Sequence, residues 1–253
     1  MKDLKKEVTE FICKFAEEYQ KENNLPDIWR EPVVGFGDAN DEYFANLKNV
    51  VTEVHKLPQF FIPDAKTVIS YFVPFKEELA ATNIDVEGNY ASAEWAKAYT
   101  DTNNLFSALN PKLAEFVKDM GYDAAVPYDI SMMKDILMSS WSQKHVAVGC
   151  GVGTFGLNHL LITERGCCGR ISSIVTTLPV EPTKRYETEN CLFKREGKCK
   201  KCVERCFSGA LTEVENDFDR FHCRKICQET EKLYNEECCG KCDTGLPCSH
   251  QIP

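Results

Sequence analysis

The sequence lacks any long apolar run. A membrane-spanning helix needs about 20 consecutive apolar residues, whereas the richest stretch, VISYFVPF at residues 68–75, has only the length of a strand. The first twenty residues, MKDLKKEVTEFICKFAEEYQ, contain no apolar segment of the kind that a secretory signal requires. We therefore expect a cytoplasmic protein with no membrane contact.

An excess of positive charge is also missing. The chain carries 30 Lys and Arg residues against 39 Asp and Glu residues, a formal net charge of −9. Non-specific binding to nucleic acids depends on Lys and Arg facing phosphates, so this balance argues against a general nucleic-acid binder. Apolar residues make up 43% and charged residues 27%, which is ordinary for a soluble globular protein.

The hydrophobic patterns alternate between helical and strand periodicity, and we find no internal repeat. These patterns predict a mixed α+β fold. From about Pro182 the sequence becomes charged and rich in cysteine, so we place a domain boundary near residue 185, between a domain at 1–185 and one at 186–253. We expect helices at 4–19, 103–120 and 130–145, strands at 66–75, 122–126, 146–148 and 170–178, and mostly irregular structure with short helical pieces over 32–64.

The 14 cysteines are unevenly distributed. Cys13 stands alone in the first 149 residues, three more lie between 150 and 168, and ten lie between Cys191 and Cys248. Stable disulfides are rare in the reducing cytosol. Such a dense group of cysteines therefore favours metal ligation, whereas Cys13, beside the apolar stripe of the first helix, is expected to pack.

Two cysteine runs carry the strongest pattern. The first is Cys191-x7-Cys199-x2-Cys202-x3-Cys206, and the second is Cys223 followed by Cys239-x2-Cys242-x5-Cys248. Two-cluster ferredoxins use C-x2-C-x2-C-x3-C-P, in which the fourth cysteine binds the other cluster. Here Phe207 replaces the proline, and Cys191 stands eight residues before Cys199 instead of three. The pattern favours two [4Fe–4S] clusters.

Zinc is the alternative metal. Cys199-x2-Cys202 and Cys239-x2-Cys242 would together supply four thiolates, although 36 residues separate them, more than in a usual zinc ribbon. Two versions of this alternative are a zinc site alone and a zinc site together with one [4Fe–4S] cluster. A zinc site alone leaves Cys191, Cys206, Cys223 and Cys248 without a role.

A glycine-rich segment precedes the cysteine runs. Gly151-Val-Gly153-Thr-Phe-Gly156 matches G-x-G-x-x-G, a pattern that binds dinucleotides when an acidic residue follows about 20 positions later. Near Thr176 the chain reads IVTTLP, and the first acidic residue is Glu181. NAD binding is therefore not favoured.

The same segment has a family resemblance. Residues 147–163, AVGCGVGTFGLNHLLIT, resemble the A-G-x-G-x-x-G-x-N-x-x-L-I segment of epoxyqueuosine reductases and reductive dehalogenases. In those families a strand with a T-D-L-P-L-like ending and then a two-cluster ferredoxin module follow. Here IVTTLPV at 174–180 and the cysteine runs take those places. The resemblance covers about residues 60–250 in order, and 146–248 in motif detail.

The resemblance implies a nitroreductase-like, cobalamin-reductase-type α/β domain followed by a ferredoxin-like domain with two [4Fe–4S] clusters. It also implies a cobalamin beside the glycine-rich segment, approached by Gly151, Val152, Gly153, Thr154, Phe155, Gly156 and Asn158. In the crossed ligand pattern one cluster takes Cys191, Cys199, Cys202 and Cys248, and the other takes Cys206, Cys223, Cys239 and Cys242. Cys227 and Cys238 compete with Cys223 and Cys239.

The remaining cysteines have no counterpart in the resemblance. These are Cys150 and the pair Cys167-Cys168, which lies in the sequence RGCCGR. We expect this basic pair to form a flexible, partly exposed turn.

Two residues are candidates for proton transfer. Epoxyqueuosine reductases carry a proton-donating Asp in a D-x-x-P-x-x-E-R segment ahead of the glycine turn. Here the region reads DILMSSWSQKH from Asp135 to His145, so Asp135 is about two positions out of register, and Lys144-His145 replaces Glu-Arg. A histidine titrates near neutral pH, so His145 is the second candidate.

The combined prediction is an iron–sulfur reductase of the epoxyqueuosine reductase type. It would act on a small-molecule or corrinoid substrate, with electrons from a donor such as ferredoxin or flavodoxin. We find no tRNA-binding helical repeats of the kind that epoxyqueuosine reductases carry, and with the negative charge we expect no nucleic-acid substrate. The alternatives are an electron-transfer module that reduces a partner such as a corrinoid protein, and a zinc-stabilised interaction protein.

Overall fold

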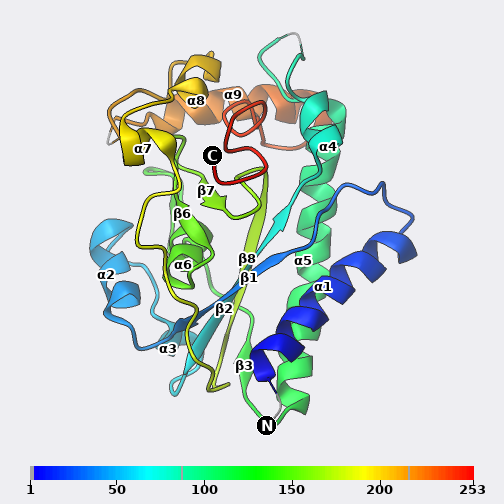
Figure 1. The fold of residues 1–253 in the computed structure, drawn as a ribbon, viewed down its shortest axis with the longest axis vertical. Helices are drawn as coiled ribbons and strands as arrows, with labels where there is room; N and C mark the ends of the chain where they lie inside the picture. The colour runs from blue at the N-terminus through cyan, green and yellow to red at the C-terminus, as the bar shows by residue number, and fades with distance from the viewer. Residues whose placement is uncertain (1–2, 87, 216) are drawn as a thin grey trace.

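A four-stranded antiparallel sheet forms the middle layer of the molecule (Figure 1). The computed structural model describes residues 3–86, 88–215 and 217–253. The strand order is β1-β2-β8-β3, with β1 at Val33–Asp38, β2 at Thr67–Pro74, β3 at Ala124–Ala125 and β8 at Gly169–Thr176. The strands β2 and β8 pair along their full length, from Thr67 opposite Thr176 to Pro74 opposite Gly169.

Apolar side chains of β2 point alternately to the two faces of the sheet, and each face is covered by a hydrophobic core. Ile69, Tyr71 and Val73 face one hydrophobic core, and Val68 and Phe72 face another, as the two-residue period of a strand requires. The first core is covered by α1 (Leu4–Glu22) and α5 (Ala93–Asp119), and the second by α2 (Glu42–Val50), α3 (Pro58–Phe61) and α6 (Gln143–Gly149). The short helix α4 spans Glu77–Thr82.

The cysteine-rich part of the chain lies at one end of this sheet (Figure 1). It contains α7 (Leu192–Glu196), α8 (Lys201–Arg205) and α9 (Arg220–Tyr234), and it adjoins the hairpin of β6 (Gly153–Phe155) and β7 (Leu161–Thr163). The last residues return to the sheet, where the Cys167 and Cys168 amides donate hydrogen bonds to the carbonyls of Cys248 and Ser249. The end of the chain therefore packs beside the start of β8.

Three predicted elements, α1, β2 and β8, are confirmed within a few residues at each end. The helix predicted at 103–120 is also present, but as α5 it begins ten residues earlier, at Ala93. Capping explains where two of them begin, since the side chains of Asp3 and Ser92 accept hydrogen bonds from the amides of Lys6 and Trp95. A short strand, β3, lies within the predicted 122–126 segment. No helix in the described ranges combines the length and apolarity of a membrane span.

Three predictions about elements are wrong. Residues 33–38, expected to be irregular, form β1, the edge strand paired with β2. The segment predicted to be helical at 130–145 begins as a hairpin, with β4 (Met132–Met133) paired to β5 (Met138–Ser139). Residues 146–148, expected to be a strand, belong to α6, because a helix buries Val146, Ala147 and Cys150 together against the second core.

Candidate functional site

Two cavities in the C-terminal third of the molecule are lined by most of the cysteines of the C-terminal runs, and a third, described below, is lined by Cys167, Cys227, Cys238 and Cys239. The larger cysteine cavity, about 220 Å³, is lined by Cys206, Cys223, Cys227, Cys239 and Cys242. The smaller cysteine cavity, about 20 Å³, is lined by Cys191, Cys199, Cys202 and Cys248. The two cavities divide the ten cysteines of the C-terminal runs into the two crossed sets expected from the sequence, with Cys227 added to one and Cys238 in neither.

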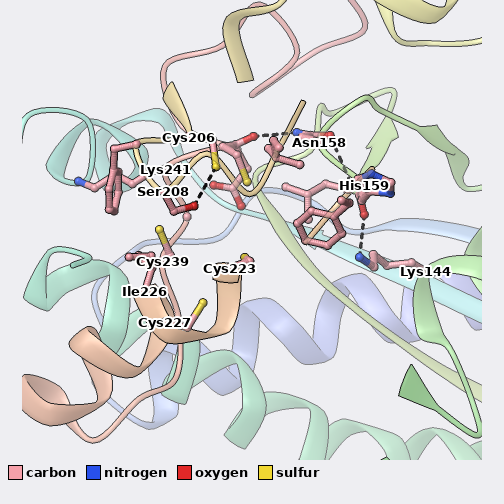
Figure 2. A pocket seen from close by; sticks show the side chains of 17 residues that line it. Lys144, Asn158, His159, Cys206, Ser208, Cys223, Ile226, Cys227, Cys239 and Lys241 are labelled. Carbon is pink, nitrogen blue, oxygen red and sulfur yellow. Dashed lines mark hydrogen bonds between the residues drawn. The ribbon is translucent and has the colours of Figure 1, made fainter. Parts of the chain in front are cut away.

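Helix α9 supplies two thiols to the larger cysteine cavity. Cys223 and Cys227 are four residues apart and therefore lie on one face of the helix; in Figure 2 their side chains border the same space as Cys206 and Cys239. A hydrogen bond from the Cys227 thiol lowers the pKa of Cys223 to about 7. Both thiols thus reach the cavity, and the choice between them as ligands stays open.

The loop that carries Cys239 and Cys242 is shaped by Gly240. Its φ is +72°, and a Cβ here would stand 2.4 Å from the indole ring of Trp95. Only glycine accepts this backbone and this approach without strain. The close packing on α5 therefore sets the direction in which Cys239 points.

The smaller cysteine cavity is built from four short segments. Cys191 caps the start of α7, and Cys202 lies in α8. The Cys167 amide donates to the Cys248 carbonyl at 2.9 Å, and the Cys167 thiol donates to the Cys248 sulfur at 4.0 Å. That second hydrogen bond lowers the pKa of Cys248. The apolar side chains of Leu157, Ile162 and Leu246 close the cavity.

Adjacent cysteines have different surroundings. Cys238 is buried against the core beneath α5, whereas Cys239 lines the larger cysteine cavity. Cys167 and Cys168 are buried, so the expected exposed turn is wrong. Cys168 donates a hydrogen bond to the Asp243 carbonyl at 2.7 Å, because the returning C-terminal loop covers this pair.

The cysteines are not arranged around one ion. The described part of the chain contains no group of three or more His, Cys, Asp or Glu side chains placed to hold a metal ion. A zinc ion requires four ligands at about 2.0–2.3 Å from one point, and a cubane requires four thiolates around it. Each cavity is lined by at least four cysteines, and the metal that they hold stays a prediction.

Lys144 is the site residue that sequence reasoning did not select. It lines the larger cysteine cavity, and its ammonium donates to the His159 carbonyl at 2.7 Å (Figure 2). Burial lowers the pKa of Lys144, while the nearby Cys242 and Cys223 act in the opposite direction. The sequence placed Lys144 beside His145, but only the helical turn of α6 shows that the lysine faces the cysteines.

The two predicted proton donors lie elsewhere. His145 is half-buried; its ring packs on Phe155 with the ring centroids 4.6 Å apart, and its Nδ1 lies 2.8 Å from Ser142 Oγ. Burial, followed by the charge of Lys144, lowers the pKa of His145 to about 4. Asp135 is exposed in the turn between β4 and β5. Neither residue is among those that line the two cysteine cavities.

The glycine-rich segment is in contact with the rest of the chain. A Cβ on Gly153 would stand 2.4 Å from the Ile162 carbonyl oxygen, and one on Gly151 would stand 3.0 Å from the Thr183 carbonyl oxygen. Val152 is buried in the second core. Thr154 accepts a hydrogen bond from the Asn190 amide, and Phe155 packs on His145. The approach of the chain itself explains these glycines, so a cofactor at residues 151–155 stays a prediction.

The end of that segment does reach the cysteines. Gly156 and Asn158 line the smaller cysteine cavity, and Asn158 also lines the larger one. The Asn158 amide group donates to the Cys242 carbonyl at 2.7 Å. Asn158 therefore lies between the two cysteine sets.

Comparison with known proteins gives one consistent result. No family model matches the chain. Epoxyqueuosine reductase of Bacillus subtilis (strain 168) is 25% identical over 174 residues, which are 67% of this chain and 41% of the relative. That of Bacillus cereus is 25% identical over 186 residues, 71% of this chain and 44% of the relative. The chain thus spans less than half the length of these curated relatives.

Solved structures show the same fold. The epoxyqueuosine reductase of Streptococcus thermophilus superposes with a TM-score of 0.57 at 18% identity, covering 98% of this chain and 66% of that one. An epoxyqueuosine reductase with an epoxyqueuosine-modified tRNA stem loop superposes with a TM-score of 0.59 at 18% identity, over 94% of this chain and 66% of that one. By sequence and by fold, the chain is a relative of the epoxyqueuosine reductases.

Proposed function

We propose that the chain is an iron–sulfur reductase of the epoxyqueuosine reductase type. The observation that carries the proposal is the division of the cysteines between two cavities, each with at least four thiols. In this proposal residues 1–185 form a nitroreductase-like domain and residues 186–253 a ferredoxin-like domain with two [4Fe–4S] clusters. Bound clusters would supply single low-potential electrons.

The surrounding residues have defined tasks in this proposal. Cys191, Cys199, Cys202 and Cys248 hold one cluster, and Cys206, Cys239, Cys242 and either Cys223 or Cys227 hold the other. The Lys144 ammonium places a positive charge beside the second set, where four thiolates leave a negative core. Leu157, Ile162 and Leu246 exclude water from the first set.

The substrate is the open part of the proposal. A relative of this fold is solved with a tRNA stem loop, which conflicts with our expectation from charge that a nucleic-acid substrate is absent. Net charge is a poor guide here, because a protein of either sign can present a local basic surface. We therefore include a modified tRNA nucleoside beside small-molecule and corrinoid substrates.

Metal analysis tests the proposal. Protein purified under anaerobic conditions is expected to contain about eight iron atoms and eight acid-labile sulfides per chain, from two cubanes. Cys202→Ser should remove about half of the iron, and Cys13→Ser should remove none, since Cys13 lies in α1 with its thiol directed at the Pro32 carbonyl. Stoichiometric zinc in place of iron would contradict the proposal and favour the interaction protein.

The packing of the glycine-rich segment favours a second candidate function, that of an electron-transfer module. The contacts of Gly151 and Gly153 with the chain itself suit an electron-transfer module that reduces a partner protein and binds no cobalamin. Titration of the anaerobic protein with cobalamin, followed by its visible absorbance, separates the two. Saturable binding at one equivalent favours the reductase, and no binding favours the module.

A further inference from the structure

A third cavity adjoins the larger cysteine cavity. This aromatic cavity, about 530 Å³, lies between the sheet, α5 and the loop at 237–243. It shares a wall with the larger cysteine cavity, formed by Lys144, Leu160, Cys227, Cys239, Gly240 and Asp243. A molecule in the aromatic cavity would therefore lie directly beside the cysteines that we assign to one cluster.

Its walls combine flat apolar surfaces with a guanidinium, that of Arg170, one of whose nitrogens has no hydrogen-bond partner among the described residues. Phe72, Phe75, Trp95 and Tyr99 line it. The guanidinium of Arg170 stacks on Tyr99 at 3.5 Å from the ring centroid, and its Nη2 donates to Asn103 Oδ1 at 3.0 Å. Its Nη1 is buried, and among the described residues this nitrogen has no hydrogen-bond partner.

Such an unpaired nitrogen is costly unless a ligand satisfies it. A buried donor without a partner loses its hydration and gains nothing in return. Tyr99 and Asn103 hold Arg170 from the side of α5, so the guanidinium is fixed before any ligand arrives. A fixed guanidinium is well suited to a carboxylate or a phosphate.

Among the charged groups that line the cavity, Arg170 is the one placed to bind an anionic group of a ligand. Glu237 is engaged by Arg224 through two hydrogen bonds of 2.7 and 3.3 Å. Lys144 adds a second positive charge to the wall. Asp243 is the remaining acid, and its loop is held by hydrogen bonds from Cys168 and Ser249 to its own carbonyl; its Oδ1 also has no partner in the described ranges.

We propose that the aromatic cavity binds a small molecule with a carboxylate or phosphate on a flat apolar body, and that Arg170 holds the anionic group. The inference rests on the proposed function in one respect: it names the class of molecule that would receive electrons from the neighbouring cluster. The binding itself requires only Arg170 and the aromatic wall. It can therefore be tested apart from iron.

Benzoate and phenyl phosphate are the two anionic probes, and benzyl alcohol is the uncharged one. Equilibrium binding is measured by calorimetry on the anaerobic protein, with iron determined on the same samples. Both anions should bind more tightly than benzyl alcohol, and the tighter of the two identifies the anionic group. Arg170→Met should weaken the anions about tenfold or more and leave benzyl alcohol unchanged.

Two further variants complete the test. Arg185→Met removes the same charge from an arginine that forms an ion pair with Asp41 on another face, and it should bind both anions as the wild type does. Arg170→Lys keeps the charge without the planar guanidinium and should weaken the anions less than Arg170→Met. Equal affinity of the wild type and both Arg170 variants, or equal binding of benzyl alcohol and the anions, would overturn the inference. Anion binding without iron would instead overturn only the proposed function.

Discussion

Cys238 and Cys239 are neighbours in the chain that point to different places. Cys239 borders the larger cysteine cavity, while Cys238 packs against the core beneath α5. Burial raises the pKa of both thiols, to about 12 for Cys238 and about 11 for Cys239, so their pKa values do not distinguish them. At the scale of single residues, the direction of the side chain is what makes Cys239 the proposed ligand.

This difference gives a matched pair of variants. Cys239→Ser should lose about half of the iron, because it removes one thiol from a set of four. Cys238→Ser should keep the full iron content, with at most a lower unfolding temperature. Iron and sulfide analysis of the two anaerobic proteins measures the result. Loss of iron in Cys238→Ser alone would reverse the assignment.

His145 gives a pH-dependent prediction. Burial lowers its pKa from the ordinary value of 6.5 to about 4 in the folded protein. Between these two pH values, His145 is therefore protonated in the unfolded chain and neutral in the folded chain. Stability from this residue is complete above about pH 6.5 and is lost as the pH falls toward 4. The unfolding temperature of the wild type should fall more between pH 7 and pH 5 than that of His145→Asn.

His55 and His159 do not obscure that comparison. Burial lowers the pKa of both, so each also destabilises the protein at acid pH, but each is present in the wild type and in the variant. The difference between the two proteins therefore isolates His145. A gap in unfolding temperature that is constant from pH 7 to pH 5 would show that its pKa is ordinary.

The hairpin of β6 and β7 shows how an element can explain a motif. Gly153 pairs with Thr163, and the Ile162 carbonyl stands where a Cβ would be. The hairpin holds Asn158 between the two cysteine sets. Gly153 therefore serves the close approach of two strands, whereas Gly151 approaches the backbone of Thr183 and Lys184.

Gly153→Ala tests this account. The added methyl group meets backbone and cannot be relieved by a side-chain rotation, so we expect a loss of about 1–3 kcal/mol in the free energy of unfolding. Gly121→Asn is the control: no atom lies within 4 Å of a Cβ at Gly121, so its cost is only the backbone strain of a side chain at φ +91°, which Asn bears better than most residues. Unfolding by urea measures both, and equal stability of the two variants would refute the steric argument.

At the scale of the whole molecule, the two parts of the chain differ in what holds them together. The sheet and its helices have two extended hydrophobic cores. The buried hydrophobic group around the smaller cysteine cavity is much smaller: it consists of three leucines, one isoleucine and three cysteines. If the C-terminal part holds the proposed clusters, metal binding is expected to contribute much of its stability.

Removal of the clusters should expose this dependence. After anaerobic oxidation and chelation, limited proteolysis is expected to cleave within residues 186–253 and to leave a resistant fragment that ends near residue 185. The protein with its clusters is the control and should resist cleavage in both parts. A protease pattern that is unchanged by chelation would show that the C-terminal part folds without metal.

The sequence by itself determined the elements with a strong local signal, and it predicted that the clustered cysteines bind metal. The helices α1 and α5 and the strands β2 and β8 each carry a complete periodic pattern with a cap or a breaker at an end. The spacing of the two cysteine runs indicated metal ligation, and the family resemblance implied the two crossed sets, which stay a prediction. The family resemblance, too, was readable from residues 147–163 and the runs that follow.

Only the tertiary structure decided what depends on packing between distant segments. The short segment 146–148 contains two β-branched valines, so its pattern suited a strand, but its contacts with the sheet and α2 make it part of α6. That helical turn brings Lys144, and not His145, to the larger cysteine cavity. The unpaired nitrogen of Arg170 likewise exists only because α5 fixes the guanidinium beside the C-terminal loop. Side-chain direction follows from neighbours far apart in the sequence, and local patterns do not encode it.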